Sequence, residues 1–309
     1  MSRLTAATGR GGALVGMAAF VVTSACWGAN MPITAVIFRV LDPFWMSPWR
    51  TAIAALTLAV LLAATEGVRA LAMPMPWRRF LMLSCAMASF FLVYNLALRH
   101  TNTITAAAFM VGSPVYAALT LRVLTGAAFD RGFWVAAPLT LVGGAIAVWG
   151  RADAPGAGFA LQGGEPLIVL CTVFWTVYSI YAQRWFEPPV TQLRRTYVAL
   201  SGATLWLFLF WAACRAAGVV GPPNLAPDAA TIGWLALTAV FATGLAGVTW
   251  NIGVARLGIP MGSLWQNAVP VFAILISMAF GFEPTPAQIA GGAIVMAGVL
   301  YMQWRKFNG

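Results

Sequence analysis

Ten long apolar runs divide this chain, and they constrain its fold more than any other feature of the sequence. A helix needs roughly 20 apolar residues to cross the hydrocarbon core of a bilayer, and the runs are close to that length. A transmembrane β-barrel would show alternating segments of about ten residues instead. The runs therefore predict helical crossings at 13–38, 43–65, 77–98, 102–124, 132–150, 165–184, 190–214, 229–254, 260–281 and 286–304.

The composition supports a surface that faces lipid. Only 8% of the 309 residues are charged and 61% are hydrophobic, whereas soluble domains carry about 25% charged residues. The net charge of +10 comes from scattered basic residues, without the basic patch and interleaved aromatic residues that mark a nucleic-acid site. We therefore expect the lipid bilayer as a partner and no nucleic acid.

The first apolar run resembles a secretory signal at its start. Arg3 and Arg10 precede an apolar stretch that contains small residues, as in a signal peptide. The run continues past Trp27 to Phe38, however, which is too long for the apolar region of a signal. We expect a retained first membrane span.

The distribution of lysine and arginine predicts the orientation in the membrane. With the N-terminus inside, the inner segments hold 13 basic residues and the outer segments hold four. Cytoplasmic loops carry an excess of basic residues. Both termini are therefore predicted to be cytoplasmic, in a multi-pass protein of the cell (inner) membrane.

The chain also repeats itself. Asn95 in the third run precedes Pro114 by 19 residues, and Asn251 in the eighth run precedes Pro270 by the same distance. In addition, the segment 142–146 in the fifth run resembles 290–294 in the tenth, each with a pair of glycines. These matches occur in one order along the chain, which indicates an internal repeat of five runs.

Five is an odd number, so the second unit enters the membrane in the opposite sense. The predicted fold is an all-α membrane protein with ten transmembrane helices as two inverted five-helix repeats, an arrangement typical of secondary transporters that work by alternating access. The predicted parts are a cytoplasmic N-terminal tail (1–12), the first repeat (13–150), an extracytoplasmic linker (151–164), the second repeat (165–304) and a cytoplasmic C-terminal tail (305–309).

The chain resembles the drug/metabolite transporter (DMT) superfamily at several residues in these spans. They are Trp27 and Asn30 in the first span, Arg50 in the second, and Pro114 and Pro270 in the fourth and ninth. Within the superfamily, the chain is similar to the EamA-type exporters. The resemblance implies a secondary transporter that exports small amphipathic metabolites.

Residues of the eighth span indicate a smaller group within the EamA-type exporters. Trp250, Asn251 and Gly253, together with the many aromatic residues, are most similar to the YddG-type exporters of aromatic and neutral amino acids. That similarity implies amino acids as the small-molecule substrate. The first repeat has Tyr94 where the second has Trp250, so the identity of the substrate remains open.

Polar side chains and large rings inside the spans form the candidate substrate site. Helical spacing places them on shared faces, and together they describe an apolar, aromatic cavity with a few amides. Such a cavity suits a zwitterion with an apolar side chain. The candidate substrate-binding residues are Trp27, Asn30, Tyr94, Asn95, Met110, Trp175, Tyr178, Trp250, Asn251, Trp265, Gln266 and Asn267.

Alternative roles remain open for several of these residues. An asparagine in a membrane helix can simply bond a neighbouring helix. Pro114 and Pro270 are either hinges or kinks needed for packing, since each removes a backbone hydrogen bond. Arg50 either contacts a substrate carboxylate or extends from the second span to the outer surface.

The positions of the titratable groups bear on energy coupling. All eight acidic residues lie in loops or at span ends, and the one histidine, His100, lies at the outer boundary. Proton-coupled carriers keep a titratable group along the pathway. We therefore predict facilitated transport, and the alternative is a drug/metabolite efflux carrier with proton coupling.

The sequence has no sign of catalysis or of a cofactor. It contains no phosphate-binding loop, and its four cysteines lie within spans without a CxxC pair. We expect no enzyme activity, no catalytic residue, no metal and no cofactor, and we favour a transporter over an ion channel or a membrane-embedded enzyme. Both a monomer and a homodimer agree with the sequence.

Overall fold

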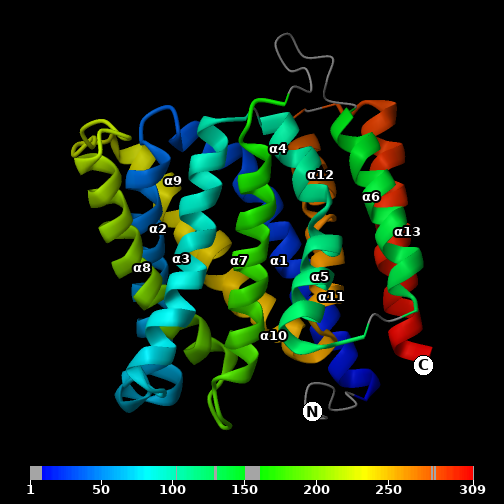
Figure 1. Cartoon of the computed structure of the whole chain (residues 1–309), viewed down its shortest axis with the longest axis horizontal. Helices are drawn as coiled ribbons and strands as arrows, with labels where there is room; N and C mark the ends of the chain where they lie inside the picture. Colours follow the sequence, from blue (N-terminus) through cyan, green and yellow to red (C-terminus); the bar gives the residue numbers. More distant parts are fainter. Residues whose placement is uncertain are drawn as a thin grey trace.

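A computed structural model describes residues 9–101, 103–128, 131–149, 161–279, 281 and 283–308. Most of the predicted N-terminal tail (1–12) and of the predicted linker (151–164) lies outside these residues. The described part of the chain is helical and contains no strand (Figure 1). The helical class predicted from the apolar runs is confirmed.

The helices follow one another with short connections. All are α-helices except a 3₁₀ turn, η1, and a π-helical segment, η2. In chain order they are α1 (Arg10–Ile37), α2 (Pro43–Glu66), η1 (Val68–Leu71), α3 (Trp77–Arg99), α4 (Thr103–Val111), α5 (Ser113–Thr125), α6 (Phe133–Trp149), α7 (Glu165–Arg184), α8 (Gln192–Ala216), α9 (Ala229–Thr238), η2 (Ala239–Leu245), α10 (Ala246–Leu257), α11 (Ile259–Gln266), α12 (Val269–Met278) and α13 (Pro286–Asn308).

Eight helices in the described residues are long and apolar enough to cross a membrane. In this count, α9, η2 and α10 form one continuous helix (Ala229–Leu257), and α11 and α12 form another (Ile259–Met278). A ninth crossing follows if α4 and α5, which meet at a bend of 49°, are counted as one span. The fifth predicted span appears as α6, an apolar helix of 17 residues. Figure 1 shows the start of α1 and the end of α13 at the same end of the molecule, as an even number of crossings requires.

Capping side chains explain where two of the spans begin. The carboxylate of Asp42 accepts a hydrogen bond from the backbone N–H of Phe44 (2.8 Å), at the start of α2. Asp228 accepts one from the backbone N–H of Thr231 (2.9 Å), at the start of α9. These bonds satisfy donors that a helix start leaves free. The bond from Thr231 also lowers the pKa of Asp228, which lies outside the spans.

Two spans are broken at related positions. The α4–α5 span breaks at Gly112, and the α11–α12 span breaks at Asn267 and Ala268. Pro114 and Pro270 lie in the first turn after each break, where proline removes a backbone hydrogen bond to the preceding helix. The prolines therefore coincide with the breaks, and their role as hinges remains a prediction.

The last helices of the two predicted repeats, α6 and α13, lie side by side (Figure 1). A Cβ atom on Gly143 would lie 2.7 Å from the carbonyl oxygen of Gly291, and one on Gly291 would lie 2.5 Å from that of Gly143. Only glycine lets two backbones approach so closely. Both glycines come from the matching Gly-Gly segments 142–146 and 290–294, so these two segments pack against each other.

The first and second halves of the chain interdigitate. Helix α1 packs chiefly against α10 and α12, and α3 packs against α7 and α8. At Gly28, a Cβ atom would lie 2.7 Å from the backbone nitrogen of Ala273 on α12, so glycine is required for this approach. The middle of the molecule is consequently formed by helices from both halves.

Candidate substrate site

A cluster of tryptophan rings lies between helices from both halves. The ring centroid of Trp27 on α1 lies 5.6 Å from that of Trp175 on α7 and 5.5 Å from that of Trp250 on α10. Trp175 and Trp250 are 5.4 Å apart. The structure thus brings together three predicted site residues from three helices, and we call them the tryptophan cluster.

Further aromatic rings extend the tryptophan cluster. Tyr178, a predicted site residue, lies 5.2 Å from Trp175. Phe90 on α3 also lies 5.2 Å from Trp175 and stacks on Tyr94 at 6.1 Å. The sequence prediction missed Phe90, although it precedes Tyr94 by four residues and such pairs share a helical face. Phe20 was missed as well and lies 5.6 Å from Trp250.

The indole N–H groups of the four tryptophans predicted for the site differ in their partners. Trp27 donates to the carbonyl oxygen of Ala242 (2.9 Å), and Trp250 donates to the hydroxyl of Ser179 (3.0 Å). The N–H groups of Trp175 and Trp265 are buried without a partner among the described residues. Buried donors are normally satisfied, so these two differ from the indole N–H groups of Trp27 and Trp250.

Asn251 joins three helices. Its side chain is fully buried, and its amide donates to the hydroxyls of Tyr178 (2.8 Å) and Thr196 (2.9 Å). These bonds connect α10 to α7 and α8. Its backbone carbonyl also accepts a bond from Gln183 (3.3 Å). The structure therefore places Asn251 in a contact between helices, one of the two roles that the sequence left open.

Asn95 and Asn267 are also engaged with neighbouring helices. The amide of Asn95 donates to the carbonyl of Pro43 (3.1 Å) and the hydroxyl of Ser47 (3.0 Å), which joins α3 to α2. The amide of Asn267 donates to the carbonyl of Val111 (2.9 Å). That bond connects the break in the α11–α12 span to the break in the α4–α5 span.

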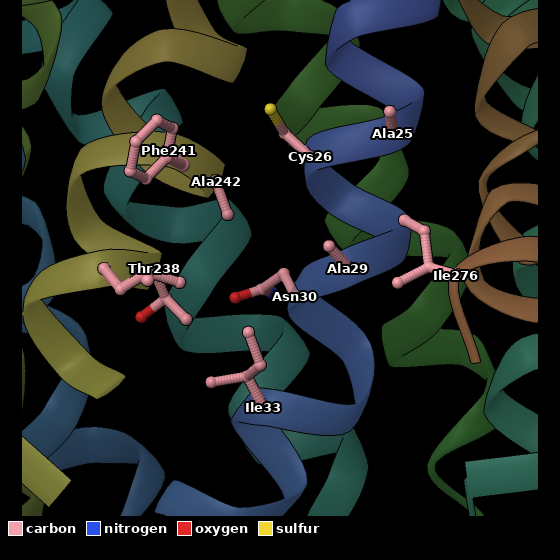
Figure 2. A pocket seen from close by; sticks show the side chains of 10 residues that line it. Ala25, Cys26, Ala29, Asn30, Ile33, Thr238, Phe241, Ala242 and Ile276 are labelled. Carbon is pink, nitrogen blue, oxygen red and sulfur yellow. The ribbon is translucent and has the colours of Figure 1, made fainter. Parts of the chain in front are cut away.

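Four other candidate residues do not contact the three rings of the tryptophan cluster directly. Tyr94 and Met110 pack on a small apolar group between α3, α4 and α7. Gln266 is partly buried at the end of α11. Asn30 lines a pocket between α1 and η2 and accepts a hydrogen bond from Thr34 (3.0 Å) (Figure 2).

Arg50 lies inside the helix layer, against α3. Its guanidinium carbon is 5.4 Å from the ring centroid of Phe91, and its Nε is buried with no partner in the described part of the chain. Arg195 follows Pro188 by seven residues, as Arg50 follows Pro43. It instead donates to the carbonyls of Val190 and Ala182, both at 3.2 Å. The Nε of Arg50 thus has no partner among the described residues, whereas the Nε of Arg195 is bonded.

The described acidic residues lie at helix ends or in loops, namely Asp42, Glu66, Glu165, Glu187, Asp228 and Glu283. Glu165, at the start of α7, is buried and accepts bonds from the hydroxyl of Thr101 (2.9 Å) and from the backbone of Gln162 and Gly163 (both 2.8 Å). Its oxygens are therefore engaged by Thr101 and by the backbone segment that precedes α7. Within the residues that the structure describes, no group of three or more His, Cys, Asp or Glu side chains could hold a metal ion.

We expect Asn251→Leu to lower the free energy of unfolding by about 1 kcal/mol, the scale of hydrogen bonds between membrane helices. The leucine would leave the hydroxyls of Tyr178 and Thr196 without the amide that now bonds them. The change is measured by thermal unfolding in detergent, with the loss of the monodisperse peak in size-exclusion chromatography as the readout.

Asn30→Leu is the matched control, because Asn30 is partly exposed and its amide oxygen bonds only Thr34 on the same helix. We expect a change within about 0.5 kcal/mol, as for substitutions away from buried networks. Equal stability of the two variants would contradict a structural role for Asn251.

The sequence model of the EamA-like transporter family matches this chain twice, at residues 14–149 and 162–304. The uncharacterized transporter YyaM of Bacillus subtilis (strain 168) is 21% identical over 274 residues, which cover 88% of each chain. The uncharacterized transporter YrdR of the same organism is 24% identical over 303 residues, which cover 94% of this chain and 92% of YrdR.

Two further similarities concern function and fold. The aromatic amino acid exporter YddG of Ancylobacter novellus is 28% identical over 169 residues, which cover 53% of this chain and 54% of that exporter. A protein of known crystal structure superimposes with a TM-score of 0.75 at 21% identity, covering 95% of this chain and 96% of the other. The second similarity is one of fold alone.

Proposed function

Because the chain belongs to the EamA-like transporter family, we propose that it exports amino acids with aromatic or neutral side chains by alternating access. It is a multi-pass protein of the cell membrane, and the curated relatives that it matches are transporters. The relative that is named an aromatic amino acid exporter supports this substrate class.

The proposal includes ten crossings in two inverted five-helix repeats, with cytoplasmic termini. The two separate matches to the family support a division between residues 149 and 162. Helix α6 supplies the fifth crossing and its partner α13 the tenth. The excess of basic residues on the side of the termini supports the orientation.

The observation that carries the proposal is the free donor of Arg50. A cation inside a membrane protein is costly and marks a functional site by default. A substrate carboxylate would satisfy its guanidinium with paired hydrogen bonds. The rings of Phe91 and Phe90 lie 5.2 Å apart, and Phe90 lies 5.2 Å from Trp175, so two phenylalanine rings connect Arg50 to the tryptophan cluster.

The tryptophan cluster suits the other end of such a substrate. Aromatic rings attract one another when their centroids lie 4.5–7 Å apart, so an aromatic side chain can replace one of the present contacts. Trp175 adds an indole N–H without a partner among the described residues. The proposed site therefore extends from Arg50 at the carboxylate end to the tryptophan cluster at the side-chain end.

Counterflow in proteoliposomes tests the proposal. Vesicles loaded with unlabelled phenylalanine should accumulate labelled phenylalanine, tryptophan and leucine, and should not accumulate phenethylamine, which lacks the carboxylate. Empty vesicles and vesicles with heat-inactivated protein are the controls. Movement of a cationic dye without movement of any amino acid would favour the drug-efflux alternative.

The same vesicles test the energy source. We expect counterflow rates that change less than about twofold with an imposed pH gradient, since the described acidic residues lie at helix ends or in loops and proton-coupled carriers use a titratable group along the pathway. A tenfold dependence on that gradient would establish proton coupling and overturn the facilitated mechanism.

A further inference from the structure

A lateral groove of about 330 Å³ lies between α1, the α9–η2 segment and α12 (Figure 2). Figure 2 shows Cys26 and Asn30 of α1 across from Phe241 and Ala242 of η2. This groove is separate from the tryptophan cluster. Its lining consists of Ala25, Cys26, Ala29, Asn30, Ile33, Leu237, Thr238, Phe241, Ala242 and Ile276.

The groove opens onto the apolar outer surface of the protein. Two of its lining side chains, Leu237 and Phe241, are 41% and 50% exposed. On α1, its floor residue Ala29 shares a helical face with Val22 and Val36, which are also exposed. Because the chain is a multi-pass membrane protein, this face meets the acyl chains of the bilayer.

The groove offers little to a polar solute. The hydroxyl of Thr238 donates to the carbonyl of Leu235 (3.0 Å), and the amide oxygen of Asn30 accepts from Thr34 (3.0 Å). The remaining lining residues are apolar apart from the thiol of Cys26. Such a lining gains contact energy from a hydrocarbon chain and little from water or a charged group.

We infer that an acyl chain of a bilayer phospholipid occupies this groove. The small side chains of Ala25, Ala29 and Ala242 leave a recess that the chain fills, continuous with the lipid surface outside. Ala242 also accepts the indole hydrogen bond of Trp27. The bound chain therefore supports the wall that positions one ring of the tryptophan cluster.

Photo-crosslinking tests the inference. The full-length protein is reconstituted with phosphatidylcholine that carries a diazirine in one acyl chain, irradiated and mapped by peptide mass spectrometry. We expect the yield per residue in the groove to exceed that at Leu56 and Leu205, which are exposed elsewhere, by about fivefold, the gain from roughly ten added van der Waals contacts.

Ala29→Phe fills the groove and should reduce the crosslinking yield per groove residue to the yield at Leu56 and Leu205. The yields at Leu56 and Leu205 themselves should not change. Ala18→Phe is the matched control, because Ala18 is exposed on the same face of α1 and is not among the residues that line the groove. We expect that control to keep the wild-type yield in the groove.

Three results would overturn the inference. One is an equal yield at the groove and at Leu56 and Leu205 in the wild-type protein, which decides the matter even if Ala29→Phe fails to fold. Another is a groove yield that Ala29→Phe does not change. The third is rapid modification of Cys26, after replacement of the other three cysteines by serine, by a charged maleimide, which would show a groove filled with water.

Discussion

Arg50→Gln is expected to raise the half-saturation concentration for amino-acid counterflow by roughly 30-fold or more. Loss of a charge-assisted bond to a desolvated carboxylate costs about 2 kcal/mol or more, which corresponds to that factor. The measurement compares concentration-dependent counterflow of phenylalanine by the Arg50→Gln protein with that by the wild-type protein.

The protein should remain folded when Arg50 is replaced. The buried Nε of Arg50 has no partner among the described residues, so its loss leaves no opposite charge uncompensated. We expect the free energy of unfolding to stay the same or to increase. Reduced transport by a stable Arg50→Gln protein would therefore point to the substrate rather than to the fold.

Arg195→Gln is the matched control, because Arg195 follows Pro188 as Arg50 follows Pro43, by seven residues. Its guanidinium bonds the carbonyls of Val190 and Ala182, so its replacement should lower stability without selectivity for carboxylate-bearing substrates. Arg50→Lys retains the charge without the paired donors and should recover only part of the affinity. Wild-type counterflow by Arg50→Gln would refute the assignment of the carboxylate site.

Gly291→Ala is expected to separate α6 from α13 and to lower the free energy of unfolding by at least about 2 kcal/mol. The new Cβ would lie 2.5 Å from the carbonyl oxygen of Gly143 and 2.5 Å from the backbone nitrogen of Ala147. Backbone atoms cannot rotate away as side chains do, so the helices must shift, as in other overpacked contacts. The midpoint of thermal unfolding should fall by roughly 4–8 °C.

Gly292→Ala provides the same substitution one residue later. There the nearest atom to the new Cβ is Cγ2 of Val271, at 3.4 Å, which is ordinary contact. The alanine also favours the helix by up to about 1 kcal/mol, so this variant should be as stable as the wild type or more stable. Equal losses in the two variants would contradict the close crossing at Gly291.

The helices could be predicted from the sequence because lipid imposes a strict local requirement. Every backbone polar group in hydrocarbon must be paired within its own helix, so a long apolar run has one acceptable structure. The predicted starts of the spans 43–65 and 229–254 agree with those of α2 and α9, where Asp42 and Asp228 cap the helices. The family resemblance drawn from a few residues in the spans is confirmed by the match over most of the chain.

The candidate site was only partly predictable. Helical spacing shows which residues share a face, and it correctly grouped large rings that meet, such as Trp175 and Tyr178. It does not show which helix stands opposite that face. Asn95 and Asn251 have the same local pattern as a cavity amide, yet both bond neighbouring helices in the structure.

The sequence by itself determined the apolar membrane helices and the membership of the family, and it singled out Pro114 and Pro270, which lie beside the two breaks. Only the tertiary structure decided that Trp27, Trp175 and Trp250 meet while Asn30 faces a lateral groove. The reason is physical. Burial in lipid and backbone hydrogen bonding act within one helix, whereas contacts between helices depend on crossing angles and on close approaches such as those at Gly28 and Gly291.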